Sequence, residues 1–235
     1  MIDLEKFYND RVKGLGSSEQ LEQVGHTVNG KAISNMDFEH LTNLIKTTLK
    51  LTSNDRLLDL CCGNGIITKQ LSKNCESVYA VDLSGEMINV AEIHNKSNNI
   101  EYHSYDILNI NNHLPTKTIF SKVVMFGALQ HFDKKQLSNI IQTISCHCDN
   151  SCRILFGFIP DTEKKWQFYD SIFKKINYFQ RRLFRSDVMG TWWEKEYIKK
   201  ISNQEGFTCE FISINEEHYG YPYRFHAILH RHSVT

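Results

Sequence analysis

At 235 residues, the chain has the length of one α/β domain with additions, and its apolar share of 41% is enough for a sizeable core. Basic and acidic residues number 27 each, so no global field favours a nucleic-acid backbone or an anionic membrane, although a local patch stays open. The first residues lack the apolar core of a signal peptide, and no apolar run approaches a membrane span, so we expect a cytoplasmic protein with no membrane partner.

Seven cysteines are scattered along the chain, and none forms a CxxC pair. Cys146, His147 and Cys148, with Cys152 nearby, would suit zinc, but a second ligand pair at zinc-finger spacing is missing. Because thiols stay reduced in the cytosol, we expect free cysteines and no metal.

Residues 1–34 are predicted to form a lead-in that closes as a lid. A short helix is expected around residues 4–12, and the GLGSS stretch ends it. Asn29-Gly30 is a tight-turn signal between two short extended pieces. Asn35 is then expected to cap a helix over residues 36–51, whose apolar side chains fall on one face.

Strands and helices alternate through the next part of the chain. Strands are predicted at 56–61, 77–82, 100–106, 121–127 and 152–159, and helices at 66–73, 85–96 and 134–148. Ser84 occupies the N-cap position of the second of these helices. This alternation predicts a parallel sheet that is covered by helices on both faces.

The rhythm breaks after Pro160, where an aromatic and basic insertion is expected. A helix over 192–206 and strands over 207–214 and 223–232 follow, and the strands are predicted to form a closing antiparallel hairpin. We therefore divide a single domain into a lid (1–34), a cofactor-binding core (35–158), a substrate-side insertion (159–191) and a C-terminal helix with its hairpin (192–235).

The stretch DRLLDLCCGNG, residues 55–65, couples a strand to a glycine-containing turn and a helix. The next predicted strand ends in Asp82, 19 residues after Gly63. Such a turn lets the backbone approach a nucleotide-like ligand, and the acid can grip ribose hydroxyls. Taken alone, this loop is compatible with NAD, a flavin or S-adenosylmethionine.

The order of elements, with LLDLCCGNG, AVDLS, YDIL and VVMFGALQHF, resembles the class I S-adenosylmethionine-dependent methyltransferases. The resemblance covers residues 36–158 and, in outline, the last two strands. It implies a Rossmann-like, seven-stranded, mostly parallel sheet with a reversed last strand and helices on both faces. An NAD-binding domain is the competing interpretation, but it usually has GxGxxG and a dehydrogenase domain, and neither is present.

The resemblance also implies a cofactor site for S-adenosylmethionine. Asp59 would bind near the methionine amine, Asp82 would bind both ribose hydroxyls, and Asp106 would accept from the adenine amine. Cys61 stands where the family has its first loop glycine, which we interpret as a backbone angle that a non-glycine residue accepts. The remaining residues expected at the cofactor are Gly63, Gly65, Leu83, Met87, Ile107, Gly127 and Gln130. For the acids the alternative is a turn-forming role, and for Gly65 it is helix packing.

Tyr8 and Arg11 lie at i, i+3 spacing in the predicted lid helix. Our hypothesis is that both face the methionine end of the cofactor. The reaction implied is an in-line displacement of the sulfonium methyl, for which the protein positions the partners and excludes water. His131 is the candidate general base, and the alternative is that it caps the following helix or packs against the cofactor.

Side chains outside the core sheet are expected to bind the acceptor. The candidates are Tyr169, Arg181, His218, Tyr219, Tyr223 and Arg224. Aromatic, arginine and histidine side chains suit a small polar metabolite that is phosphorylated or sugar-linked. We therefore predict an enzyme that methylates an O or N nucleophile of such a molecule.

Other functions stay open. FGAL replaces the NPPY or DPPY motif of base-amine methylation, and the zero net charge disfavours tRNA or rRNA, although the RRLFR stretch at 181–185 is basic. A protein or RNA methyltransferase, a dehydrogenase and a non-catalytic S-adenosylmethionine-binding regulatory module are the alternatives. The sequence fixes neither the acceptor nor the oligomeric state.

Overall fold

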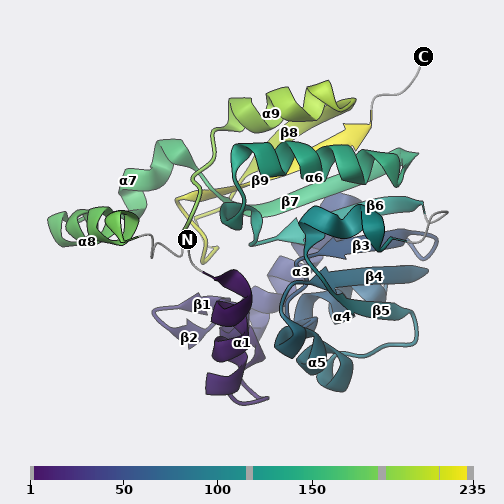
Figure 1. The fold of residues 1–235 in the computed structure, drawn as a ribbon, viewed down its shortest axis with the longest axis horizontal. Coiled ribbons are helices and arrows are strands. Elements are labelled where there is room, and N and C mark those ends of the chain that lie inside the picture. Colours follow the sequence, from purple (N-terminus) through teal and green to yellow (C-terminus); the bar gives the residue numbers. More distant parts are fainter. Residues whose placement is uncertain (1–2, 115–118, 185–188, 217, 232–235) are drawn as a thin grey trace.

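The computed structural model describes residues 3–114, 119–184, 189–216 and 218–231. In these residues one sheet has seven strands in the order β5-β4-β3-β6-β7-β9-β8 (Figure 1). Its strands are β3 (Arg56–Leu60), β4 (Ser77–Asp82), β5 (Ile100–Ser104), β6 (Phe120–Phe126), β7 (Cys148–Pro160), β8 (Phe207–Ser213) and β9 (Arg224–Arg231). Neighbours from β5 to β7 are parallel, and β9 runs antiparallel to both β7 and β8. The predicted Rossmann-like sheet with its reversed strand is confirmed.

Helices cover both faces of this sheet because its strands are apolar on both sides. Leu57 and Leu58 are consecutive in β3, so their side chains point to opposite faces, and each is fully buried in a separate core. The first core includes α6 (Lys134–Cys146) and α9 (Lys195–Gln204), and the second includes α3 (Asn35–Leu49) and α4 (Ile66–Ser72). The helix α5 (Gly85–His94) contacts β4 and β5.

Side-chain hydrogen bonds to backbone amides mark where α3 and α5 begin. Ser84 caps α5 as predicted, because its hydroxyl accepts from the Met87 amide. The cap of α3 was placed one residue too late at Asn35: Ser34 accepts from the Asp37 amide, and Asp37 accepts in return from the Ser34 amide. Asn35 is the first residue inside the helix, so its side chain has no capping role.

The N-terminal segment lies beside the sheet edge where the parallel strands end (Figure 1). It comprises α1 (Leu4–Gly14), α2 (Gln20–Gln23) and a hairpin of β1 (Thr27–Val28) and β2 (Lys31–Ala32). The predicted turn is confirmed, since Asn29 and Gly30 have φ of 51° and 80°. Buried Asn64 ties this segment to the loop after β3 by donating to the Gln20 carbonyl and the Gln23 side chain, both at 2.8 Å.

The insertion after β7 contains α7 (Lys165–Phe168) and α8 (Ile172–Leu183), which project away from the sheet (Figure 1). Arg185, the last residue of the RRLFR stretch, lies outside the described residues. None of the helices within the described ranges is long and apolar enough to cross a bilayer.

Candidate active site

The predicted cofactor residues gather at one edge of the sheet. Asp59 lies near the end of β3, Asp82 ends β4, Asp106 follows β5 and Gly127 follows β6. These four strands are adjacent and parallel, so their carboxyl ends meet at the same edge, which is where open α/β sheets bind ligands. These four residues, which are far apart in the sequence, therefore lie at the same edge of the sheet.

The Asp82 carboxylate is held by the backbone on both sides. Its Oδ2 accepts from the Gly63 amide at 2.8 Å, and its Oδ1 accepts from the Ser84 amide at 2.9 Å. Burial raises the pKa of Asp82, and the backbone donors oppose that rise. Each carboxylate oxygen has a second lone pair, so this group can accept two further hydroxyl donors without losing its support.

Asp59 lies under the loop and is buried. Its Oδ2 accepts from the Thr68 hydroxyl at 2.7 Å, which links the end of β3 to α4. Burial raises the pKa of Asp59 to about 7, and the nearby Asp82 adds to the rise. A cation placed beside Asp59 would lower that pKa again.

The loop backbone corrects the interpretation of Cys61. Its φ is +59°, in the left-handed region, so the position has the conformation that favours glycine. A side chain there costs about 1–2 kcal/mol relative to glycine. The angle follows from a loop in which Cys61, Gly63 and Gly65 are all left-handed. Burial beside Asp82 and Asp59 raises the pKa of the Cys61 thiol, so it stays neutral.

The two loop glycines leave room for different neighbours. A Cβ on Gly63 would lie 2.7 Å from Cγ1 of Val24, so glycine allows the N-terminal segment to approach the loop. A Cβ on Gly65 would lie 2.5 Å from the Tyr102 hydroxyl, which donates to the Asn95 carbonyl. The packing alternative for Gly65 thus has a specific partner, whereas contact of either glycine with a cofactor stays a prediction.

The predicted adenine residues surround the start of α5 and the turn after β5. Asp106 caps the short 3₁₀ helix η1 (Ile107–Asn112) by accepting from the Leu108 amide at 2.9 Å. Ile107 and Met87 are buried, while Leu83 is half-buried. These apolar side chains and the Asp106 carboxylate lie near the strand ends of the same sheet edge.

The turn after β6 has open space at its centre. A Cβ on Gly127 would meet no atom within 4 Å, and its φ is +69°. Gln130 supports the turn by donating to the Gly127 carbonyl at 2.5 Å. Within the described residues, the other side-chain atom of Gln130, Oε1, is buried without a hydrogen-bond partner. A polar ligand that binds at this turn could donate a hydrogen bond to Oε1 of Gln130.

Tyr8 and His131 form a hydrogen-bonded pair across this edge. The Tyr8 hydroxyl lies 3.0 Å from Nε2 of His131, and the two rings meet edge to face. Burial lowers the pKa of His131 to about 4, with a further contribution from Arg224. Burial and the nearby Asp82 raise the pKa of Tyr8 to about 12. Both groups are therefore neutral at physiological pH. Asp133 caps α6, so His131 has no capping role.

Arg11 has a different role from Tyr8, although both lie on α1. Its Nε and Nη2 donate to the Glu22 carbonyl at 2.9 and 2.5 Å. This side chain joins α1 to α2 and supports the N-terminal segment. A contact between Arg11 and the methionine end of a cofactor stays a prediction.

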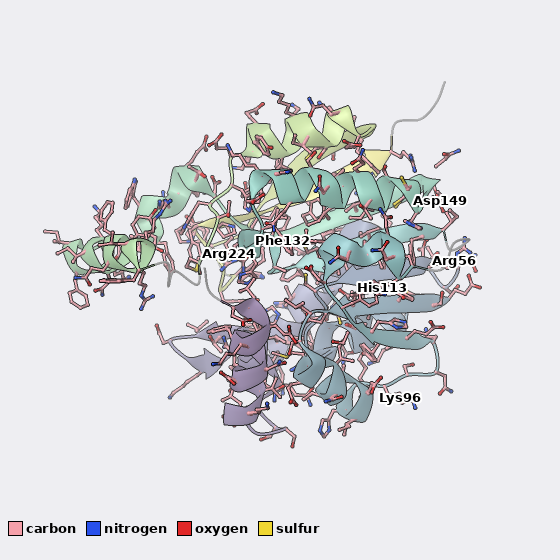
Figure 2. The ribbon with its side chains drawn as sticks, viewed as in Figure 1. Arg56, Lys96, His113, Phe132, Asp149 and Arg224 are labelled. Atoms are coloured by element: carbon pink, nitrogen blue, oxygen red, sulfur yellow. The ribbon has the colours of Figure 1, made fainter. Side chains whose placement is uncertain are left out.

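Arg224 is one of the residues that we predict on the acceptor side. It lies at the base of the α7–α8 projection, near α1 (Figure 2). Its Nη1 donates to the Phe158 carbonyl at 2.5 Å, and its guanidinium lies 4.3 Å from the centroid of the Phe158 ring. Among the described residues, its buried Nε has no hydrogen-bond partner. An anionic or carbonyl oxygen would satisfy this donor.

The other predicted acceptor residues separate into three places. Tyr219 and His218 stack at 4.5 Å beside Phe158. Tyr169 and Tyr223 belong to an aromatic cluster with Phe168 and Trp192. Arg181 is exposed on α8.

Three further residues of this region were not predicted from the sequence. His26 is buried, its Nδ1 lies 2.7 Å from the Tyr219 hydroxyl, and burial lowers its pKa to about 4. Phe126 stacks on Phe158, which has a φ of +64°. The sequence carries no local signal for these contacts, because they join the N-terminal segment, two strand ends and the final hairpin.

The described residues contain no group of three or more potential ligands that could hold a metal ion.

Sequence comparison relates part of the chain to methyltransferases. Residues 57–150 match the family model described as a methyltransferase domain. An uncharacterized methyltransferase, C70.08c of Schizosaccharomyces pombe, is 43% identical over 51 residues, 22% of this chain and 20% of that protein. A malonyl-[acyl-carrier protein] O-methyltransferase of Bacillus cereus is 35% identical over 69 residues, 28% of this chain and 26% of that protein. The chain thus matches about a fifth to a quarter of the length of these curated relatives.

Solved structures match over much more of the chain. Magnesium protoporphyrin IX methyltransferase from Synechocystis PCC 6803 with bound SAH aligns over 97% of this chain and 98% of its own, with a TM-score of 0.63 and 16% identity. The N-methyltransferase NodS from Bradyrhizobium japonicum WM9, in complex with S-adenosyl-L-homocysteine (SAH), aligns over 84% and 88%, with a TM-score of 0.59 and 16% identity. At this identity the likeness concerns the fold. The Synechocystis enzyme has also been solved with bound SAM. Residues 57–150 therefore match a methyltransferase domain, and the chain shares its fold with these solved methyltransferases.

Proposed function

We propose that this protein transfers the methyl group of S-adenosylmethionine to an oxygen or nitrogen nucleophile of a small polar metabolite. The observation that carries the proposal is the neutral Tyr8–His131 pair, 3.0 Å apart, at the sheet edge that Asp82 and Gly127 also reach. The cofactor supplies an activated methyl group, so the chain's own residues need only hold the donor, orient the acceptor and take up a proton.

The residues at the edge fit the cofactor by their chemistry. The Asp82 carboxylate has unused lone pairs that could accept from two ribose hydroxyls. The open space at Gly127 would admit the methionine part of the cofactor beside the turn. Asp59, whose pKa is raised by burial, would ionise more readily beside an α-ammonium group. Asp106 would accept from the adenine amine. The side chains that would flank the adenosine are Leu83, Met87 and Ile107.

The acceptor side favours a molecule with an anionic or carbonyl oxygen. Arg224 offers its unpartnered Nε, while its Nη1 stays fixed on the Phe158 carbonyl. Rings of Phe158 and Tyr219 line the same region. A guanidinium with an aromatic wall suits a phosphate, carboxylate or sugar-linked group, as in the substrate class that we predicted.

The Tyr8–His131 pair can take up the proton that an O–H or N–H acceptor releases. The acceptor would donate to the Tyr8 oxygen, and the Tyr8 proton would pass to Nε2 of His131. His131 is neutral at physiological pH, so Nε2 has a free lone pair, and its pKa of about 4 makes it a weak base that would hold the proton only transiently. S-adenosylmethionine, when bound, would supply the methyl carbon to the nucleophile, and the electron pair of the broken carbon–sulfur bond would stay on sulfur.

Replacing Tyr8 with phenylalanine is expected to lower the rate of methyl transfer by about 100-fold, the lower end of the typical contribution of a positioned proton-transfer group. Binding of SAH should weaken much less than methyl transfer, because the substitution keeps the ring that we predict at the methionine end of the cofactor and removes only the hydroxyl. Tyr197→Phe is the matched control, since its hydroxyl donates to the Lys134 carbonyl on the surface of α6. The readout is transfer of a labelled methyl group from S-adenosylmethionine to a pool of cellular metabolites.

The same assay separates the alternative functions. Label in the small-molecule fraction supports the proposal. Label only in protein or RNA would replace it with a macromolecular methyltransferase, and cofactor binding without turnover on any fraction would indicate a regulatory module. An unchanged rate for Tyr8→Phe would show that the pair takes no part in catalysis.

A further inference from the structure

We propose that α8 docks this protein onto an anionic lipid surface. The observation is a continuous apolar face that nothing in the described structure covers. Its side chains are between 50% and 78% exposed and are Ile172, Phe173, Ile176, Phe179 and Leu183. The adjoining Phe184 is 76% exposed. This interaction surface is independent of the methyl transfer proposed above.

The spacing of these residues makes one stripe. Ile172, Ile176, Phe179 and Leu183 follow one another at intervals of four, three and four residues, which keeps them on one side of an α-helix. The 12-residue helix is about 18 Å long. Other large apolar side chains that are exposed, such as Ile93 and Met36, lie singly on separate helices. Only contiguous patches of this kind indicate an interaction site.

Basic residues flank the apolar stripe. Lys174, Lys175, Arg181 and Arg182 lie on α8, and the helix contains no acidic residue. Lys174 forms an ion pair with Asp170 just before the helix at 3.0 Å, with both side chains more than half exposed. The zero net charge of the whole chain gives no reason to expect a membrane partner, but it averages over this local patch. A stripe of aromatic and aliphatic residues with lysine and arginine beside it is typical of interfacial helices.

The apolar face points outward because the opposite side of α8 is fixed. Tyr178 is buried there, and its ring contacts Tyr169 at 4.7 Å and Trp166 at 5.9 Å. Its hydroxyl accepts from Nη1 of Arg182 at 2.8 Å and from Lys165. The helix projects from the body of the protein (Figure 1). Its Tyr178 side faces α7, to which Trp166 belongs. A single projecting helix presents a convex stripe that suits a flat bilayer interface rather than a groove.

The basic residues of α8 favour an anionic lipid surface over a second copy of this chain as the binding partner. A two-fold pairing through α8 would bring its basic flanks against the same basic flanks of the other copy, which is repulsive. An anionic bilayer neutralises these flanks while it takes up the apolar side chains. The aromatic cluster of Tyr169, Trp192 and Tyr223 connects the base of this projection to Arg224, so docking would bring the acceptor side close to the surface.

The test is co-sedimentation of the full chain with vesicles of phosphatidylcholine alone or with about 30 mol% phosphatidylserine. We expect binding to the anionic vesicles that weakens with added salt. Ile176→Asp combined with Phe179→Asp should reduce the partition coefficient at least about tenfold, because two charged side chains replace apolar ones that would enter the bilayer. Lys175→Glu combined with Arg181→Glu should reduce it on anionic vesicles. The matched control is Ile93→Asp, which changes a 73% exposed isoleucine on α5 and should bind like the wild type.

Three results would overturn the proposal. One is no binding to anionic vesicles, and another is equal binding by the Ile176→Asp/Phe179→Asp variant. The third is a wild-type dimer that this variant converts to a monomer in sedimentation velocity, with no vesicle binding by either. Circular dichroism and thermal unfolding of each variant will test whether the fold is intact. We expect it to be, because the substituted side chains are exposed.

Discussion

Replacing Asp82 with alanine is expected to weaken SAH binding by about 100-fold or more. The ribose hydroxyls would lose the two charge-assisted hydrogen bonds that we propose they donate to the Asp82 carboxylate, each contributing about 1.5–3 kcal/mol. The substitution also releases the Gly63 and Ser84 amides, which Asp82 now holds at 2.8 and 2.9 Å. Asp82→Asn keeps acceptor capacity without the charge, so an intermediate loss is expected. Isothermal titration calorimetry measures both.

The matched control is Asp149→Ala. This carboxylate also accepts from a backbone amide, that of Ser151 at 2.8 Å, but it lies near the start of β7, at the other end of the sheet from Arg224 (Figure 2). Its loss should leave the dissociation constant for SAH unchanged. Equal affinities for the wild type and for a folded Asp82→Ala variant would show that the acid does not bind the ribose. Thermal unfolding of each variant separates a lost ligand contact from a lost fold.

Acid is expected to destabilise the protein through His26 and His226. Burial lowers the pKa of each from 6.5 to about 4. Between these values the unfolded chain binds protons that the folded chain does not, so the free energy of unfolding falls as pH falls from 6.5 to 4. At pH 5 the loss is about 2 kcal/mol for each histidine. Asp59, with a pKa raised to about 7, gives a change of similar size and opposite sign over this range.

A double variant isolates the two histidines from every other titrating group. Asn at position 226 can still accept from the Phe158 amide as Nδ1 of His226 does at 3.1 Å, and Asn at position 26 can still reach the Tyr219 hydroxyl. The free energy of unfolding in urea, measured at pH 7 and pH 5, should fall by about 4 kcal/mol more in the wild type than in His26→Asn/His226→Asn. The control is His40→Asn on an exposed site of α3. If the free energy of unfolding falls equally with pH in the wild type and in the double variant, His26 and His226 do not cause the acid destabilisation.

The sheet could be predicted from the sequence because its information is local. Apolar strands, glycine turns and capped helices alternate, and parallel strands must end at one edge, so Asp59, Asp82 and Asp106 come together without knowledge of any side-chain contact. The Asn29-Gly30 turn is a further case, since both residues readily adopt positive φ.

The acceptor side could not be predicted in the same way. Tyr8 meets His131 across 123 residues, and His26 meets Tyr219 across 193, so each contact depends on how the N-terminal segment lies against the sheet edge. The left-handed backbone of Cys61 gives no sign in the residue type, because cysteine seldom adopts it. The composition of α8 shows aromatic and basic residues, but only the structure shows that Tyr178 faces inward while the apolar stripe faces solvent.

The most direct test of the central claim is a calorimetric titration of the wild-type protein with S-adenosylmethionine, SAH and NAD. A cofactor site built on Asp82 and the loop after β3 predicts one bound S-adenosylmethionine or SAH per chain, with a dissociation constant on the order of micromolar, and no binding of NAD. Heat from NAD but none from S-adenosylmethionine or SAH would contradict the assignment of this site to a methyl donor.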